Sequence, residues 1–493
     1  MASKGQQSLV IQAPRQGIAP SPHLGFADMQ NIDIDSIPGI IKLNTILEKK
    51  SGTTVDAQVK WMVKNPASPS NLYALDSNGS VYNSSDSGAT WAELSDREGE
   101  GEGLAVWKDY LIVNDGDKLD TYGPLSGAPA WTDDWQSTPQ DDGVWGPMLV
   151  SKLDGNLYIG NGRYISSISE NSGQDFVPGT TASFTYTSQA LTLPEDYRIK
   201  CLAELNNNLM VGTWQGTNIY DNKIADIFPW DGSSETYNNP IQLNENGINA
   251  MINIAGNLYI LAGLGGKIYK SNGVQAWAIG EIPLSVANID GGKYLEPFPG
   301  AIMSFKDKLY FGINSNSTSN MGIYSLMETS SGNIVNMEHS ISTLTTGGTN
   351  PLIIGALLGI TRDQFVCGWR DNATYGIDKL STTSFAYSTN YSGFFESALY
   401  QVGSYLNLMQ FTSMEFILAK ELATSEGIQI KYRINLTDDW TTLGTYTTAN
   451  IGSGKTSFRE NQIAIPPCEQ LQIRVEFLGT STTTPEFKQL ILV

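Results

Sequence analysis

The hexapeptide GNLYIG (residues 155–160) contains the pattern that decides the fold, a polar turn followed by an apolar strand that begins at Leu, Tyr or Phe. The pattern occurs seven times, as SNLYAL (70–75), KDYLIV (108–113), GNLYIG (155–160), NNLMVG (207–212), GNLYIL (256–261), DKLYFG (307–312) and DQFVCG (363–368). Aligned on residues 72, 110, 157, 209, 258, 309 and 365, the repeats are spaced by 38, 47, 52, 49, 51 and 56 residues. Such a period is typical of the blades of a β-propeller.

Further short apolar segments precede and follow most of these repeats, so that each repeat contains several strands. A single four-stranded blade cannot bury both of its faces, and neighbouring blades must therefore pack together in a closed ring. We predict an all-β fold in which residues 59–390 form a β-propeller of about seven blades. A count of six or eight blades, or a pair of β-sandwiches, is the alternative that the pattern leaves open.

One turn of the first repeat has a distinct motif, SSDSGATWAEL (84–94). It fits Ser-x-Asp-x-Gly-x-x-Trp with Ser84, Asp86, Gly88 and Trp91, and it resembles the Asp-box hairpin of sialidases and other β-propellers. We expect Asp86 to accept hydrogen bonds from the turn and Trp91 to pack beneath the blade. A degenerate copy, SENSGQDF (169–176), has a similar spacing. Both copies favour an architectural role for the motif.

The segments on either side of the repeats have a different character. Residues 1–58 are rich in proline and lack a sustained period, which predicts an irregular N-terminal arm that docks on other structure. Residues 391–493 contain alternating segments such as GIQIKYRI (427–434) and LQIRVEFL (471–478), which predict a C-terminal β-sandwich.

Composition and charge narrow the range of functions. The 493 residues contain 50 Asp and Glu against 30 Lys and Arg, a net charge of −20, which disfavours sequence-specific binding of nucleic acids and anionic membranes. Three widely spaced cysteines, Cys201, Cys367 and Cys468, indicate buried free thiols. No signal peptide or bilayer-length apolar run is apparent, so we expect synthesis in the cytoplasm and no membrane insertion.

A search for catalytic chemistry finds no residue set to propose. Only two histidines are present, His23 and His339, and neither lies in a metalloprotease or catalytic-triad pattern. The paired aspartates in TDDW (132–135), QDDG (140–143) and TDDW (437–440) are typical of turns, and Asp115, Asp117 and Asp120 form either a solvated turn or an incomplete Ca²⁺ loop. We therefore predict no catalytic, cofactor or metal site.

A resemblance to a known family rests on the N-terminal segment GFADMQNIDIDSIPGIIKLN (25–44). Its Asn31, Asp33, Ser36, Pro38 and Gly39 fit N-x-D-x-x-S-x-P-G, which looks like the start of many tail and tail-tip proteins of bacteriophages. In organisation the chain is similar to the tail-nozzle proteins, the tail tubular protein B class, of short-tailed phages.

This resemblance implies a structural protein of the virion tail, in a homo-oligomeric ring, with six copies as one possibility. Its partners would be adaptor or tail-tube subunits and tail fibres, and the exiting DNA would pass an acidic lumen without sticking. Two alternatives stay open. One is a receptor- or glycan-binding propeller that uses Trp131, Trp135, Trp214 or Trp230 as stacking platforms, and the other is a propeller hydrolase.

Overall fold

The chain folds into two compact units that are discontinuous in sequence. The computed structural model describes residues 8–12, 28–34, 36–50, 55–95, 99–139, 145–216, 224–282, 295–315, 321–329, 332–340, 352–371, 374–385 and 393–493. Unit 1 contains residues 1–47, 324–345 and 380–493, and unit 2 contains residues 48–323 and 346–379. The chain therefore passes between the two units four times.

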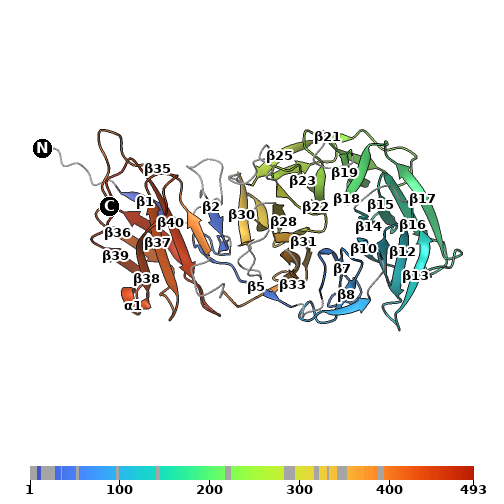
Figure 1. The fold of residues 1–493 in the computed structure, drawn as a ribbon, viewed down its shortest axis with the longest axis horizontal. Helices are drawn as coiled ribbons and strands as arrows, with labels where there is room; N and C mark the ends of the chain where they lie inside the picture. The colour runs from blue at the N-terminus through green and yellow to red at the C-terminus, as the bar shows by residue number, and fades with distance from the viewer. Residues whose placement is uncertain are drawn as a thin grey trace. The chain divides into compact units, whose positions relative to one another are not determined.

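Unit 2 is a seven-bladed β-propeller (Figure 1). Blades 1 to 3 contain β6 (Val59–Lys64), β7 (Leu72–Asp76), β8 (Val81–Ser84) and β9 (Ala92–Ser95); β10 (Gly101–Trp107), β11 (Tyr110–Asp115), β12 (Lys118–Gly123) and β13 (Ala130–Ser137); and β14 (Met148–Val150), β15 (Leu157–Asn161), β16 (Tyr164–Glu170) and β17 (Phe184–Thr192). Blades 4 and 5 contain β18 (Tyr197–Leu205), β19 (Asn208–Gln215), β20 (Ala225–Trp230) and β21 (Ile241–Leu243); and β22 (Ile248–Ile254), β23 (Asn257–Ala262), β24 (Lys267–Ser271) and β25 (Ala276–Glu281). Within unit 2, blade 6 contains β26 (Leu295–Glu296), β27 (Ile302–Phe305) and β28 (Lys308–Ser315). Blade 7 contains β31 (Leu352–Gly359), β32 (Phe365–Asp371), β33 (Thr374–Leu380) and β5 (Leu47–Lys49).

The ring closes through strands from both ends of the propeller sequence. The innermost strands β6, β10, β14, β18, β22, β27 and β31 contact one another in this order, and β31 contacts β6. The outer strand of blade 7 is β5, which precedes blade 1 in the sequence, and the Lys50 amide donates to the Ile377 carbonyl at 2.9 Å. A strand from before the first blade thus completes the last blade, and this arrangement leaves no open end in the ring.

The repeated residues of the sequence are the second strands of the blades. All seven alignment positions, Leu72 to Phe365, lie on β7, β11, β15, β19, β23, β28 and β32, so the prediction of seven blades is confirmed. The apolar side chains of these strands pack between blades. One buried cluster combines Tyr73, Leu75 and Val81 of blade 1 with Leu104 and Leu111 of blade 2, and similar clusters join later pairs of blades.

Unit 1 contains a β-sandwich. One sheet has the order β1 (Leu9–Gln12), β41 (Phe487–Leu492), β36 (Met414–Leu418) and β39 (Ser457–Glu460). The other contains β29 (Gly322–Thr329), β30 (Gly332–Ser340), β2 (Asp28–Gln30), β34 (Gly393–Glu396), β40 (Gln470–Leu478), β37 (Gly427–Arg433) and β38 (Thr441–Thr447), with β35 (Tyr400–Gln401) beside β40 and the short helix α1 (Thr448–Ile451) after β38.

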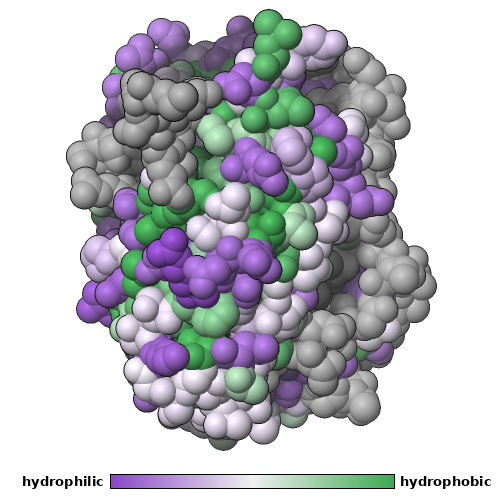
Figure 2. Space-filling view, turned by 90° about the vertical axis from the view of Figure 1, so that its left-hand side faces the viewer, coloured by the Kyte–Doolittle hydropathy of each residue, from purple (hydrophilic) through white to green (hydrophobic). Residues whose placement is uncertain are grey.

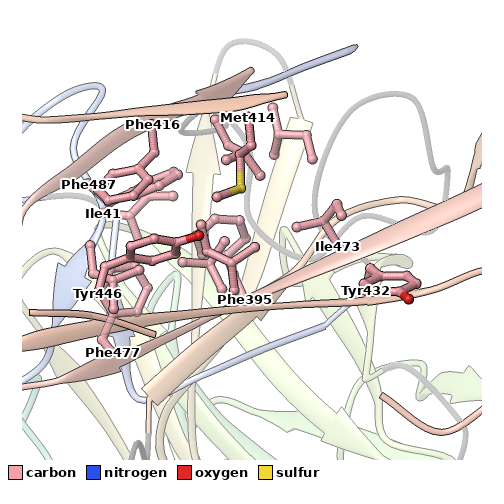
Figure 3. Close-up of a cluster of buried hydrophobic side chains, with 14 of the residues drawn as sticks. Ile41, Phe395, Met414, Phe416, Tyr432, Tyr446, Ile473, Phe477 and Phe487 are labelled. Carbon is pink, nitrogen blue, oxygen red and sulfur yellow. The ribbon is translucent and has the colours of Figure 1, made fainter. Parts of the chain in front are cut away.

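Aromatic side chains from the two sheets fill the core of this sandwich. Phe416 and Phe487 come from the first sheet, and Phe395, Phe477 and Tyr446 come from the second; Figure 3 shows these side chains pointing toward one another. Phe395 and Phe487 have ring centroids 5.5 Å apart, within the range of favourable aromatic pairs. The alternation of apolar residues that predicted a sandwich thus corresponds to one buried face on each sheet.

The motif that carries the phage resemblance forms a hairpin in unit 1, between β3 (Ile32–Asp33) and β4 (Lys42–Leu43). The Ile40 amide donates to the Ile37 carbonyl at 3.1 Å, with Pro38 and Gly39 between them and Gly39 at φ +78°, the pattern of a type II turn. The Asp33 carboxylate accepts from the backbone amide and the hydroxyl of Ser36.

Strands from the N-terminal segment are part of both units, which differs from the expected division at residues 58/59 and 390/391. β1 pairs with β41, and β2 pairs with β34, so the described parts of residues 1–47 belong to the sandwich. Residues 324–345, expected in the propeller, also belong to unit 1. The reason is that a β-strand bonds to partners far away in the sequence, which a division along the chain cannot represent.

Two smaller expectations concern the whole chain. All three cysteines are buried and unpaired, as predicted, and burial raises the pKa of each thiol, that of Cys201 to about 12. Within the described residues, no helix is long and apolar enough to cross a membrane.

Candidate functional site in the propeller channel

A repeated irregularity places polar side chains at the same level of several inner strands. In blades 1, 2, 4, 5 and 7 the pairing between the inner strand and its neighbour shifts by one residue. The extra residues of these β-bulges are Lys60, Glu102, Lys200, Asn249 and Gly355. A bulge changes the direction in which one side chain points without ending the strand. The first four of these residues are buried, and they are the polar members of the cluster described next.

Trp145, just before β14 of blade 3, joins these residues across the ring. Its ring lies 5.3 Å from that of Phe298 in blade 6 and 6.1 Å from that of Trp61 in blade 1. The ammonium groups of Lys60 and Lys200 lie 5.3 and 5.8 Å from the Trp145 ring centroid, a favourable cation–π geometry. One buried indole therefore contacts blades 1, 4 and 6, and it occupies the centre of the propeller at this level.

Lys200 makes the closest ion pair of this cluster. Its Nζ atom lies 2.5 Å from Oε1 of Glu296 and 3.1 Å from Oδ1 of Asn249, and the Lys200 side chain is only 2% exposed. Asn249 in turn donates to the Gly263 carbonyl at 2.6 Å. The pair links blade 4 to blade 6, and Asn249 adds an acceptor from blade 5, so the buried charge of Lys200 has both an acidic partner and an amide acceptor.

Glu102 and Lys60 have fewer polar partners than Lys200 and Glu296 have. Both are buried, and within the described part of the chain neither side chain makes a hydrogen bond or a close ion pair. Burial raises the pKa of Glu102 to about 7, with the charge of Lys60 opposing the rise and those of Glu100 and Asp115 adding to it. Burial also lowers the pKa of Lys60. Glu102 therefore changes its charge near neutral pH.

This channel cluster, defined as Lys60, Glu102, Trp145, Lys200, Asn249 and Glu296, combines two cations and two acids around an aromatic ring. The arrangement can hold the blades together and bind or release a proton at Glu102. No short sequence motif marks these residues, because they are far apart in the sequence. The available signal is a charged side chain inside an otherwise apolar inner strand, as in VKWMV (59–63) and GEGLAV (101–106).

The predicted Asp-box residues come together as expected. The Asp86 carboxylate accepts from the Ala89 and Thr90 amides, each at 2.9 Å, and from the Thr90 and Ser84 hydroxyls. Although burial by itself raises its pKa, the hydrogen bonds from Thr90, Ser84 and Ala89 lower the pKa of Asp86 to about 2. The Gly88 amide donates to the Ser84 hydroxyl at 2.8 Å.

The Asp-box turn also has a role that the motif does not reveal. Trp91 is buried with residues of blade 7, including Val366 and Ile377. A Cβ atom on Gly88 would lie 2.7 Å from Cγ1 of Val366, and Gly88 has φ +79°, so glycine is required here on both counts. The turn therefore stabilises the junction at which the first and last blades meet. In the degenerate copy, the Asn171 side chain bonds to Thr185 and Ala182 instead.

Replacing Asp86 with alanine is expected to lower the free energy of unfolding of the propeller by about 1 kcal/mol, the usual cost of losing a capping side chain at an exposed site. Because the pKa of Asp86 is below that of an unfolded aspartate, its contribution is present above pH 4 and lost as the pH falls toward 2. Denaturant unfolding at neutral and acidic pH measures both effects. Asp86→Asn keeps an acceptor oxygen and is the matched control, with an expected smaller loss.

A groove between blades 3 and 4 is the second feature of unit 2 that could bind a ligand. It has a volume of about 360 Å³ and is lined by Asp154, Tyr158, Glu204 and Asp231, among others. Its carboxylates are engaged locally, since Asp154 accepts from the Tyr158 hydroxyl at 2.7 Å and Glu204 accepts from the Lys152 amide at 2.9 Å. Hydrogen bonds from Ser233 and Ser234 lower the pKa of Asp231 to about 2.

Several other residues that the sequence singled out have ordinary structural roles. Trp214 and Trp230 are 6% and 1% exposed, so the prediction that they serve as stacking platforms is wrong: both pack between strands. Trp131 and Trp135 are half-buried against Tyr122 and Phe176.

The predicted acidic turns and histidines can be placed only in part. Asp120 is buried and accepts from the Asp134 amide, whereas Asp117 is exposed. Throughout the described ranges, no group of three or more His, Cys, Asp or Glu residues is arranged to hold a metal ion. His339 is buried on β30, while His23 and residues 140–143 lie outside the described residues.

Comparisons with known proteins were made for the whole chain. No protein-family model matches the sequence, and no curated protein matches it significantly. Similar solved structures include YCF48 bound to a D1 peptide (10% identity, TM-score 0.46, 72% of this chain and 100% of that chain). They also include the Cps50 (Swd1) β-propeller domain of Myceliophteria thermophila (10% identity, TM-score 0.45, 69% and 100%) and the RRP9 WD40 repeats (11% identity, TM-score 0.44, 69% and 98%). The chain is an all-β protein with a seven-bladed propeller.

Proposed function

We propose that this protein is a structural component of a bacteriophage tail, part of the nozzle or tip through which DNA leaves the virion. The observation that carries the proposal is the N-terminal hairpin, whose Asn31, Asp33, Ser36, Pro38 and Gly39 resemble the start of many phage tail and tail-tip proteins. These residues shape a hairpin whose Ile32 and Leu43 enter the sandwich core.

The channel cluster is consistent with this proposal in one specific way. Trp145 and its charged neighbours occupy the centre of the propeller, so the propeller channel is not the path of DNA. A path for DNA would instead be the lumen of a ring of several copies, as the resemblance implies. In such a ring the net charge of −20 on each copy would repel the phosphate backbone.

Immunogold electron microscopy tests the proposal, with antibody to this chain on particles from a culture that produces it. We expect label at the tail end of the particles, and an antibody to a capsid protein serves as the positional control. Particles without label, together with free protein in the lysate, would overturn the proposal.

A receptor- or glycan-binding propeller is the second candidate, and the groove between blades 3 and 4 favours it. Asp154, Glu204 and Asp231 line this groove, and carboxylates are the usual acceptors for sugar hydroxyl groups. A glycan array with the purified chain checks this candidate, with Asp231→Asn as the variant. Binding that is retained at full strength by the variant would exclude this groove.

A further inference from the structure

A hairpin tip in unit 1 exposes large apolar side chains that the fold does not use. Tyr405 is 87% exposed, Leu406 is 91% exposed and Leu408 is 51% exposed. Isolated exposed apolar residues are common, but three within four positions of one turn are typical of an interaction site. Figure 2 shows hydrophobic residues exposed among hydrophilic ones on one face of the molecule.

The tip is held in place by backbone hydrogen bonds. Ser404 and Asn407 exchange both of their backbone hydrogen bonds, at 3.1 and 2.8 Å, and this leaves Tyr405 and Leu406 as the two-residue loop. The base of the hairpin is bonded to a neighbouring segment, since Met409 and Cys468 exchange both bonds at 2.9 Å. The apolar side chains are therefore presented by a fixed backbone, which reduces the entropy lost on binding.

The two chain segments that form the tip and bond to its base carry almost no charge. Residues 398–413 contain no Asp, Glu, Lys or Arg, and residues 461–471, which bond to the base of the hairpin, contain only Glu469. The second segment also exposes Ala464, Pro466 and Pro467. An uncharged apolar tip with a rim of proline and amide side chains lacks the basic residues that would attract it to anionic lipid.

We propose that the tip, Tyr405, Leu406 and Leu408 with the 463–467 segment as its rim, binds a second copy of this chain. The net charge of −20 makes two copies repel each other over most of their surface. An uncharged apolar region is the part of the surface where two copies can meet without that cost. This inference does not depend on the tail assignment, because self-association is a property of the purified chain.

The contact has an expected size and salt dependence. A stable interface buries about 800 Å² per partner, which is more than the tip alone can supply. The tip would therefore form the centre of the interface, and the 463–467 segment would form its rim. Added salt screens the repulsion between acidic surfaces and leaves apolar contacts intact. We therefore expect self-association to strengthen as the salt concentration rises, the opposite of an interface made from ion pairs.

Sedimentation velocity over a range of protein concentrations tests the inference, with the double variant Tyr405→Ser and Leu406→Ser. We expect the unaltered chain to gain mass with concentration and the double variant to raise the dissociation constant by at least about tenfold. Val274→Ser and Leu436→Ser are the matched controls, because these residues are 82% and 57% exposed at other sites and should leave association unchanged. An equal melting temperature for all variants shows that the fold is intact.

Three outcomes would overturn the inference. The unaltered chain could stay monomeric at every concentration and salt level, or the double variant could associate as tightly as the unaltered chain. In the third outcome, the unaltered chain shows no self-association but binds vesicles of neutral phosphatidylcholine, and the double variant does not bind them. That result would identify a membrane surface, and not a second copy, as the partner of the tip.

Discussion

Replacing Lys200 with methionine is expected to lower the free energy of unfolding of the propeller by about 3–5 kcal/mol, the usual cost of removing one partner of a buried ion pair. Lys200 is 2% exposed, and Glu296, 2.5 Å away, would become a buried charge without compensation. The cation–π contacts of Lys200 with Trp145 and Trp214 would also be lost. Denaturant unfolding followed by tryptophan fluorescence measures the effect.

The double variant Lys200→Met and Glu296→Gln separates the charge effect from a loss of packing. Removing both charges should restore much of the stability, because a buried pair replaced by neutral groups of similar volume is often close to neutral in free energy. Lys118→Met breaks an exposed pair, with side chains 44% and 56% exposed, and should cost far less stability than Lys200→Met because water screens the exposed charges. A double variant less stable than Lys200→Met would contradict the proposed role of the charge.

Replacing Glu102 with glutamine is expected to stabilise the protein in a pH-dependent way. The pKa of Glu102 is raised from 4.5 to about 7, so the folded state holds its proton more tightly than the unfolded chain does. The stability linked to this proton is fully present below pH 4.5 and is lost as the pH rises through 7. The loss is about 3 kcal/mol, because each pH unit between the two pKa values corresponds to about 1.4 kcal/mol. Glutamine resembles the protonated acid and should escape this loss.

Unfolding of both proteins at a series of pH values from mildly acidic to mildly alkaline checks this result. We expect the advantage of Glu102→Gln to be small at the acidic end and to grow toward the alkaline end. Glu93→Gln is the matched control, because Glu93 is exposed on β9 and its replacement should change stability by less than about 0.5 kcal/mol. A stability difference that does not vary with pH would show that Glu102 is not the titrating group.

Local patterns predicted much of the fold because each pattern reports which side chains one strand buries. Leu72, Tyr110, Leu157 and the equivalent later residues were recognisable as second strands since every blade needs the same apolar strand beside its turn. The Asp-box was recognisable for a similar reason, because Asp86 and Gly88 satisfy a turn whose partners lie within a few residues. Short-range hydrogen bonds of this kind leave a regular spacing in the sequence.

The channel cluster could not be predicted from such patterns. Lys60, Glu102, Lys200 and Asn249 are each the extra residue of a bulge, and a bulge adds one position to a strand without changing its composition. In a regular strand, alternate side chains point to opposite faces, and a prediction from this alternation places charged residues on the solvent face. The extra residue of a bulge breaks the alternation, so the prediction fails there. Only closure of the ring brings Lys60 and Lys200 to Trp145 and places Asn249 beside Lys200.

The sequence by itself determined the repeat, the seven blades and the sandwich, because apolar periodicity and turn chemistry act over a few residues. Tertiary structure alone decided that β5 completes blade 7, that residues 324–345 join unit 1, and that Lys200 pairs with Glu296. Each of these joins segments separated by dozens to hundreds of residues. The energy of such contacts depends on which strands become neighbours when the ring and the sandwich close, and local spacing does not encode that choice.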